Sequence, residues 1–269
     1  MIGPALLFCP ADRPDRYEKA LAAADAVIID LEDAVAPENR PAARAALMGT
    51  PIDPARTIVR VNPIGSADFE SDLAALANTE YDTVMLPKAD SAAALERLEE
   101  YEVIALCETA AGVLAAPDLA AIPNVIALMW GAEDLVASLG GTGTRHPDGS
   151  YRALAVHARS SVLLAAGAHG KSAIDTVHLD IADVAGLAAE AEDAAASGFA
   201  ASACIHPSQV DVIRAAYRPD EAAVAEAREL LEQARTHSGV FTFRGRMVDE
   251  PLLRHARAVL ARAAAIPGD

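Results

Sequence analysis

Carboxylates directly follow apolar segments at several points in the chain. In VIIDLEDAV (27–35), an apolar run leads into Asp30, Glu32 and Asp33. Two later segments, CETAAG and WGAEDL, repeat this order and add the carboxylates of Glu108, Glu133 and Asp134. Each carboxylate taken alone could cap the following helix or lie in a solvated loop. Taken together, they could form a site for a cation.

The segments that carry these carboxylates alternate with Ala-rich helical stretches. Continuously apolar runs of this kind indicate parallel strands that are covered on both faces. We expect strands near 5–9, 26–30, 57–61, 83–86, 103–107, 125–129, 173–178 and 201–205. We expect helices near 15–23, 38–48, 67–77, 91–100, 110–121, 151–168 and 183–197, and one that opens at 208. Eight strand-to-helix cycles predict an α/β fold, a (β/α)8 TIM barrel. A doubly wound open sheet is the alternative, but no GxGxxG follows the first strand.

The chain continues beyond the eighth cycle. Residues 219–236 have the pattern of a charged amphipathic helix, HSGVFTFRGRMVDEP is β-like and rich in turns, and a last helix is expected near 251–265. We therefore predict a barrel domain over 1–218 and a C-terminal helical extension over 219–269. This extension could form a lid or pack on an adjacent subunit.

In a TIM barrel the loops after the strands build the active site. The six carboxylates named above would then meet at one end of the barrel and repel one another, unless cations lie between them. Mg²⁺ favours a few carboxylates together with water and substrate oxygens. Glu108 and Asp134 follow neighbouring strands, so they are the predicted metal ligands.

Two basic residues also follow predicted strands. Arg60 either forms a buried ion pair with one of the carboxylates or binds the oxygen atoms of a substrate, which suits its planar guanidinium group. Lys88 either forms an ion pair within the site or acts as a Schiff-base amine. His206, in IHPSQ, either orders its loop or transfers protons.

The charge of the chain argues against some classes of partner. The net charge of −17, without a basic stripe, argues against nucleic-acid binding. One local basic cluster, formed by Arg13, Arg16 and Lys19, is either a solvated helix face or a contact for an anionic cofactor tail such as the phosphates of coenzyme A.

Several features predict a cytoplasmic protein. Cys9, Cys107 and Cys204 lie in apolar runs and match no metal-binding spacing, so we expect buried free thiols rather than a nucleophile. MIGPALLFCP lacks the features of a signal peptide, and no apolar run has the length of a membrane helix.

The order of motifs resembles a known family. LFCPADRP, VIIDLEDAV, VRVN, MLPKAD, CETAAGV, MWGAEDL, CIHPSQV and FRGRMVDEP occur in this order in citrate lyase β-subunit-like proteins of the HpcH/HpaI aldolase and malyl-CoA lyase superfamily. The resemblance covers nearly the whole chain. It implies a TIM barrel, a homotrimer or hexamer, and a Mg²⁺-dependent enzyme acting on CoA thioesters of 3-hydroxy acids.

The resemblance also implies roles for individual residues. Glu108 and Asp134 would bind the metal, and Glu32 and Asp33 would order water around it. Arg60 would hold substrate oxygens, and Asp249, in the MVD motif, would be an acid/base residue that enters the site of an adjacent subunit. The residues expected along the CoA are Phe8, Arg16, Lys19, Ile205 and His206. The family's first motif often reads VPG followed by lysines, whereas this chain has CPADRPDR.

We therefore expect a carbon–carbon lyase that cleaves or forms a short 3-hydroxyacyl-CoA, giving acetyl-CoA and a 2-oxo acid or related carbonyl product. Citramalyl-, malyl-, citryl- and 3-hydroxy-3-methylglutaryl-CoA are the candidate substrates. Three alternatives remain: a CoA-independent metal aldolase acting on pyruvate or oxaloacetate, a Schiff-base aldolase using Lys88, and a non-catalytic subunit or binding protein.

Overall fold

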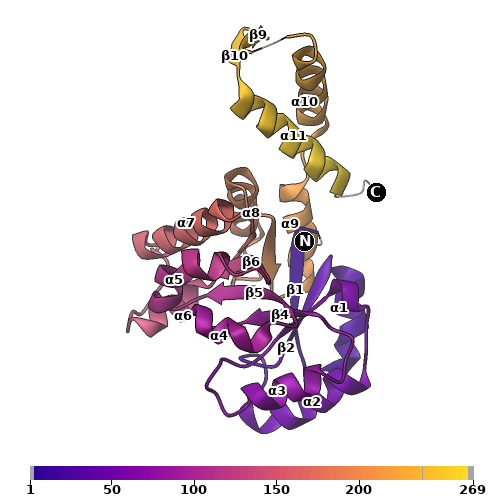
Figure 1. Ribbon diagram of the computed structural model, residues 1–269, viewed down its shortest axis with the longest axis vertical. Coiled ribbons are helices and arrows are strands. Elements are labelled where there is room, and N and C mark those ends of the chain that lie inside the picture. Colours follow the sequence, from indigo (N-terminus) through magenta and orange to yellow (C-terminus); the bar gives the residue numbers. More distant parts are fainter. Residues whose placement is uncertain (1–2, 238, 266–269) are drawn as a thin grey trace. The chain divides into compact units, whose positions relative to one another are not determined.

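The structure is a computed structural model that describes residues 3–237 and 239–265. Eight parallel strands follow one another around a closed barrel, in which β1 pairs with both β2 and β8 (Figure 1). The strands are β1 (Ala5–Pro10), β2 (Ala26–Asp30), β3 (Thr57–Arg60), β4 (Thr83–Leu86), β5 (Glu102–Cys107), β6 (Val125–Trp130), β7 (Ser172–Asp175) and β8 (Ala201–Cys204). The predicted TIM barrel is confirmed, and the open sheet is ruled out.

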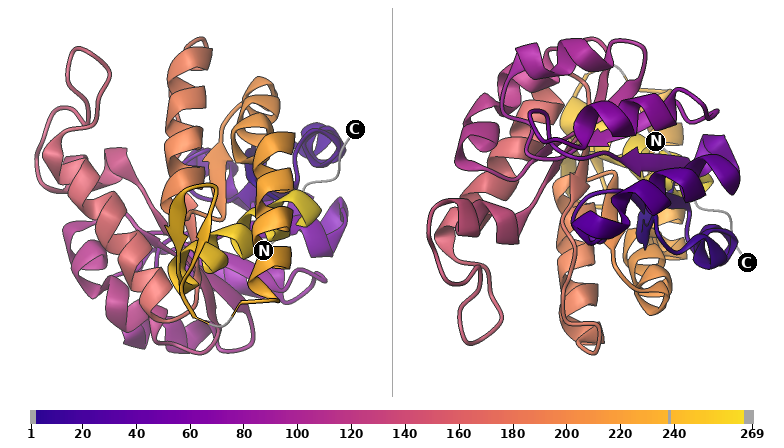
Figure 2. Two further views of the ribbon diagram at one scale, coloured as in Figure 1. Left: turned by 90° about the horizontal axis from the view of Figure 1, so that it is seen from above. Right: turned by 90° about the horizontal axis from the view of Figure 1, so that it is seen from below.

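The helices that follow the strands lie outside the ring of strands, as Figures 1 and 2 show. They are α1 (Tyr17–Ala23), α2 (Arg40–Gly49), α3 (Phe69–Leu76), α4 (Ala92–Leu95), α5 (Ala110–Ala120), α6 (Ala132–Ser138), α7 (Ala153–Ala168), α8 (Val184–Ser197) and α9 (Val210–Tyr217). Short 3₁₀ turns precede or extend some of them: Pro14–Arg16, Pro37–Asn39, Glu96–Leu98 and Pro207–Gln209. A further 3₁₀ turn, Pro54–Arg56, precedes β3.

Local sequence signals set several helix ends. The Thr109 hydroxyl accepts a hydrogen bond from the Gly112 N–H at the start of α5, and the Asp183 carboxylate does the same for Gly186 in α8. Helix α8 is terminated by Gly198, the residue after its last turn, whose φ of 113° is accessible to glycine and strained for other residues.

Two details of the sequence prediction were wrong. Strand β7 ends at Asp175, so the predicted residues 176–178 belong to the following loop. Helix α6, which begins at Ala132, was not predicted, because it is only two turns long and its acidic first turn resembles a loop.

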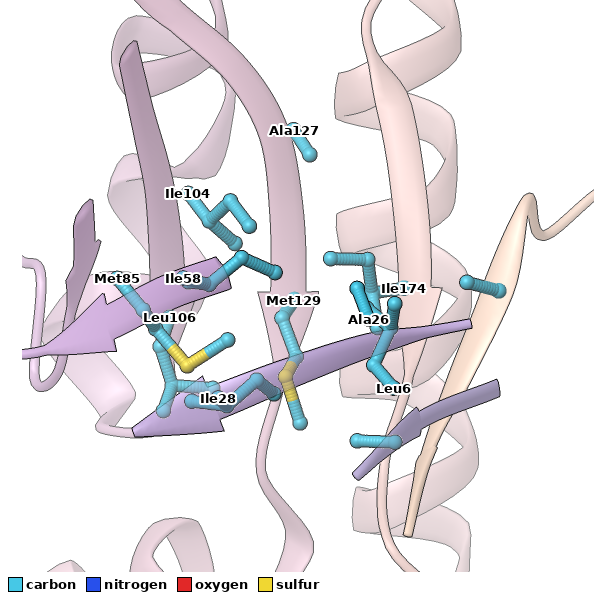
Figure 3. Packing of buried hydrophobic residues seen from close by; sticks show 12 residues of the cluster. Leu6, Ala26, Ile28, Ile58, Met85, Ile104, Leu106, Ala127, Met129 and Ile174 are labelled. Atoms are coloured by element: carbon cyan, nitrogen blue, oxygen red, sulfur yellow. The ribbon is translucent and has the colours of Figure 1, made fainter. Parts of the chain in front are cut away.

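The interior of the barrel is filled by apolar side chains from alternate strand positions. In β5, Ile104 and Leu106 point inward, together with Ile28 and Met129 from other strands (Figure 3). The intervening residues are buried as well, because the outer helices cover them. This double burial explains why the strands are continuously apolar in sequence.

The chain divides into two compact units, with the boundary between Ile213 and Arg214. The second unit contains α10 (Glu221–Ala234), α11 (Glu250–Ala265) and the hairpin of β9 (Phe241–Phe243) and β10 (Arg246–Val248). Its core includes Leu230, Phe241 and Phe243. The extension therefore has a hydrophobic core of its own.

The three cysteines are buried and form no disulfide, as predicted. Burial raises the pKa of Cys9 to about 11 and that of Cys107 to about 12, so both are protonated at neutral pH and unsuited to act as nucleophiles. Among the described residues, no helix has the length and apolar character needed to span a bilayer.

Candidate active site

A cavity of about 250 Å³ lies at the carboxyl ends of the barrel strands. Eight of the residues selected from the sequence line it: Phe8, Asp30, Asp33, Arg60, Glu108, Glu133, Asp134 and Ile205. They come from six different strand ends, so the parallel barrel alone brings them together. The cavity is also lined by Thr176, Val177 and Leu179 of the loop after β7, which the sequence prediction had partly assigned to a strand.

Arg60 and Asp30 form a buried, two-pronged ion pair in this site. The Nε and Nη2 groups of Arg60 donate to the two oxygens of Asp30 over 2.7 and 2.6 Å. Asp30 also accepts hydrogen bonds from the backbone N–H groups of Glu32 and Ala34. Burial disfavours the charged guanidinium, but Asp30 overcomes this effect and raises the pKa of Arg60. Asp30 is thus the partner of Arg60, and its four accepted bonds leave it unsuited to bind a metal.

One nitrogen of the Arg60 guanidinium, Nη1, is not used in the hydrogen bonds to Asp30. Nη1 lies 3.1 Å from Oε2 of Glu32, an oxygen that is buried and accepts no hydrogen bond. The guanidinium carbon also lies 4.8 Å from the centre of the Phe8 ring. Both alternatives considered for Arg60 are therefore compatible with the structure, since it forms an ion pair and still faces the cavity.

The ammonium group of Lys88 lies among four carboxylates. Nζ is 2.6 Å from Glu32, 3.5 Å from Asp134, and 3.7 Å from both Glu108 and Asp33. Burial disfavours the charged amine, but Glu32 and Glu108 outweigh burial and raise the pKa of Lys88. A Schiff-base lysine needs a lowered pKa to be nucleophilic, so this environment argues against that alternative.

Glu108 is nearly buried at the end of β5, and its Oε1 accepts a hydrogen bond from the backbone N–H of Lys88. Burial, and next the charge of Asp134, raise the pKa of Glu108 to about 8. Burial also raises the pKa of Glu32, against the opposing effect of Arg60 and Lys88. A divalent cation would favour the charged form of these groups.

Asp134 and Glu133 occupy the first turn of α6 but differ in their contacts. Asp134 is partly exposed and turns toward Lys88. Glu133 also borders the cavity, but its Oε1 accepts a hydrogen bond from the Thr144 hydroxyl. Of these two, Asp134 is therefore the better candidate ligand.

The donor set fits Mg²⁺. Within residues 3–237 and 239–265, no three His, Cys, Asp or Glu side chains are arranged to hold a metal ion by themselves. Mg²⁺ does not need such a set, because it binds one or two carboxylates and fills its other positions with water and substrate oxygens. Glu108 and Asp134 are such a pair, and the Oε2 atom of Glu32 without a hydrogen-bond partner offers a further acceptor beside them.

Glu32 and Lys88 are not part of the cavity lining but contact residues that are. Other selected residues also lie outside the lining. Arg16 and Lys19 are exposed near the start of α1. The exposed His206 caps the turn Pro207–Gln209 through its Nδ1, which favours the loop-ordering alternative. Asp249 belongs to the second unit and precedes α11, where its Oδ1 accepts a 3.5 Å hydrogen bond from the Leu252 N–H.

Gly131 is a site residue that the sequence analysis missed. A Cβ atom at this position would lie 2.8 Å from Cβ and 2.9 Å from Oε2 of Glu108. The small residue between Trp130 and Ala132 therefore leaves the space that the Glu108 side chain occupies. The sequence signal that could have identified Gly131 was its position directly after a strand and three residues before Asp134.

Replacing Gly131 with alanine should weaken Mg²⁺ binding by about tenfold or more, because the added methyl group displaces the Glu108 carboxylate. Isothermal titration calorimetry would measure the change. Gly167→Ala is the control, since its added methyl meets no atom within 4 Å. Equal Mg²⁺ affinities of the two variants would contradict this role of Gly131.

The closed barrel and the acidic cavity at its carboxyl end, where Arg60 and Lys88 lie beside the carboxylates, define a TIM-barrel protein with a candidate Mg²⁺ site. A family model described as HpcH/HpaI aldolase/citrate lyase matches residues 5–207, and one described as a carbon–carbon bond lyase of the TIM-barrel fold matches residues 152–266. The chain belongs to the HpcH/HpaI aldolase/citrate lyase family. The resemblance seen in the sequence is thereby confirmed.

Relatives are similar over nearly the whole chain. A citrate lyase subunit beta-like protein of Mycobacterium tuberculosis is 57% identical, with 97% of this chain and 96% of the relative covered. The mitochondrial citramalyl-CoA lyase of Homo sapiens is 30% identical, with 97% and 86% covered. The crystal structure of CitE from M. tuberculosis, in complex with magnesium, acetoacetate and coenzyme A, has a TM-score of 0.94 and 56% identity, and 98% of each chain is covered.

Proposed function

We propose that this protein is a Mg²⁺-dependent carbon–carbon lyase that cleaves or forms a short 3-hydroxyacyl-CoA. The cleavage products are acetyl-CoA and a 2-oxo acid or related carbonyl compound. The observation that carries the proposal is the pair Glu108 and Asp134, which face one cavity beside Arg60. The CitE complex with magnesium, acetoacetate and coenzyme A supports it.

In the proposed reaction Glu108 and Asp134 hold Mg²⁺, which supplies Lewis-acid polarisation of the carbonyl worth several kcal/mol. The Nη1 group of Arg60 donates to the oxygen on which enolate charge develops, because its other groups are fixed by Asp30. Phe8 and Leu179 contribute apolar side chains to the cavity lining.

The proposal places CoA along the rim of the cavity. Ile205 and Phe8 line the opening and offer apolar contacts to the pantetheine arm. Arg16 and Lys19, which are exposed near the start of α1, would pair with the phosphates, and His206 would lie near them. The exposed basic groups in an otherwise acidic chain favour this assignment over a solvated helix face.

We further propose a cytoplasmic homotrimer, or a hexamer of two such trimers. In this assembly the C-terminal unit of one subunit packs on the next and brings Asp249 to the neighbouring cavity as the acid/base residue. The compact core of that unit, which contains Phe241 and Phe243, supports a role for it as a structured element.

Replacing Asp249 with asparagine should lower turnover by about 10²- to 10⁴-fold, the usual range for loss of an acid/base group. Binding of Mg²⁺ should stay unchanged, and the amide can still cap α11. Steady-state kinetics and calorimetry would measure the two effects. Glu250→Gln, which removes a charge from the next position, should retain turnover. Unchanged activity of Asp249→Asn would reject the assignment.

The reaction itself is tested with a panel of citramalyl-, malyl-, citryl- and 3-hydroxy-3-methylglutaryl-CoA. With Mg²⁺ the purified chain should release acetyl-CoA from at least one of them, and EDTA should abolish the release. Free CoA appearing in place of acetyl-CoA would indicate hydrolysis, the activity after which a (3S)-malyl-CoA thioesterase of Cereibacter sphaeroides, 36% identical, is named. Turnover of oxo acids that free CoA does not inhibit would favour the CoA-independent aldolase.

A further inference from the structure

Lys88 contacts all four carboxylates of one cluster. We call this cluster, formed by Glu32, Asp33, Glu108 and Asp134, the acidic ring. Its ammonium group lies between 2.6 and 3.7 Å from a carboxylate oxygen of each of the four. These carboxylates come from the loops after β2, β5 and β6, whereas Lys88 follows β4. One positive charge thus joins three loops that are distant in sequence.

The backbone conformation of Lys88 also suits its position among these carboxylates. Its φ of 52° lies in the left-handed region, and among the described residues Arg244 is the one other non-glycine residue with a positive φ. This conformation is strained for a residue with a side chain and tends to persist at functional sites. Here it accompanies a backbone N–H that donates to Glu108 while the side chain turns toward Glu32.

We propose that Lys88 is the internal counter-ion of this acidic ring: it holds the four carboxylates together before a metal binds, and its charge weakens the affinity for Mg²⁺. The inference rests on the proposed metal site. It assigns Lys88 a positioning role, distinct from the Schiff-base chemistry that its residue type also permits.

Two effects of opposite sign follow from Coulomb's law. Without the ammonium group, the four carboxylates repel one another in the metal-free protein, which becomes less stable. The same change removes a positive charge near the bound cation, so Mg²⁺ binds more tightly. A merely structural disturbance would weaken Mg²⁺ binding. Tighter binding in a less stable protein therefore identifies the counter-ion role.

The experiment compares Lys88→Met with Lys171→Met. Lys171 is the matched control because it bonds to the Ile122 and Pro123 carbonyls, far from the acidic ring in the fold. For Lys88→Met we expect a metal-free melting temperature several degrees below that of wild type and a Mg²⁺ dissociation constant at least about tenfold lower. Lys88→Arg, which keeps the charge, should restore most of both values.

The melting temperature and the Mg²⁺ affinity together distinguish a failure of the counter-ion role from a failure of the proposed metal site. If Lys88→Met binds Mg²⁺ as wild type does, or more weakly, the counter-ion role is overturned although the metal site stands. If the wild-type protein binds no Mg²⁺, the proposed metal site fails. In that case the melting temperatures still decide whether Lys88 holds the ring together, and an unchanged value in Lys88→Met would overturn the inference.

Discussion

Replacement of Glu108 by glutamine is expected to lower turnover by at least about 10³-fold, because loss of Lewis-acid catalysis worth several kcal/mol translates into such a factor. Glutamine preserves the size of the side chain but removes the charge that attracts the cation. Asp134 alone should then hold Mg²⁺ weakly. Calorimetry should show little or no Mg²⁺ binding at millimolar concentrations, and acetyl-CoA release should fall to near background.

The control for this variant is Glu102→Gln. Glu102 lies at the opposite end of the same strand, β5, where it is exposed, so its loss removes an equal charge without touching the cavity. The control should keep wild-type Mg²⁺ affinity and turnover. A Glu108→Gln protein that still turns over at the wild-type rate would show that Glu108 is not a metal ligand.

Replacement of Asp30 by asparagine is expected to destabilise the barrel by about 3–5 kcal/mol, the usual cost of breaking a buried ion pair from one side. Asparagine cannot accept both hydrogen bonds of Arg60 and the two backbone bonds that Asp30 now accepts. Arg60 would retain Glu32 as a weaker partner, which favours the lower end of the range.

Urea unfolding followed by the fluorescence of Trp130 would measure this loss. Trp130 is the single tryptophan of the chain and is fully buried in the barrel, so its signal reports on that unit. Glu70→Gln is the control, because Glu70 pairs with Arg97 at the surface, where such pairs contribute about 0–1 kcal/mol. A loss below 1 kcal/mol in Asp30→Asn would contradict the structural role assigned to the pair.

Strand and helix positions were largely predictable because they depend on local sequence. A strand covered on both faces must be apolar at consecutive positions, as in β2 and β6, and each such run is visible without knowledge of its neighbours. The prediction failed where local signals were weak. Helix α6 is too short to show a helical period, and the apolar Val177 extended the predicted β7 beyond Asp175.

The set of candidate residues was also predictable, because in a parallel barrel every loop after a strand opens on the same face. This rule placed Glu108, Asp134 and Arg60 at one cavity. It did not apply to Arg16 and Lys19, which were selected from charge and resemblance and are exposed outside that cavity. Nor did it reveal Gly131, whose importance lies in a missing side chain.

The sequence by itself thus determined the order of the elements and the residues that follow each strand, because both are written in consecutive positions. The tertiary structure decided which charges pair. Asp30 is 30 residues from Arg60, and Glu32 is 56 residues from Lys88. Whether Arg60 and Lys88 act as ion-pair partners, as a substrate contact or as a nucleophile depends on distances of a few ångströms. Only closure of the barrel sets those distances, since Coulomb energy depends on separation in space rather than along the chain.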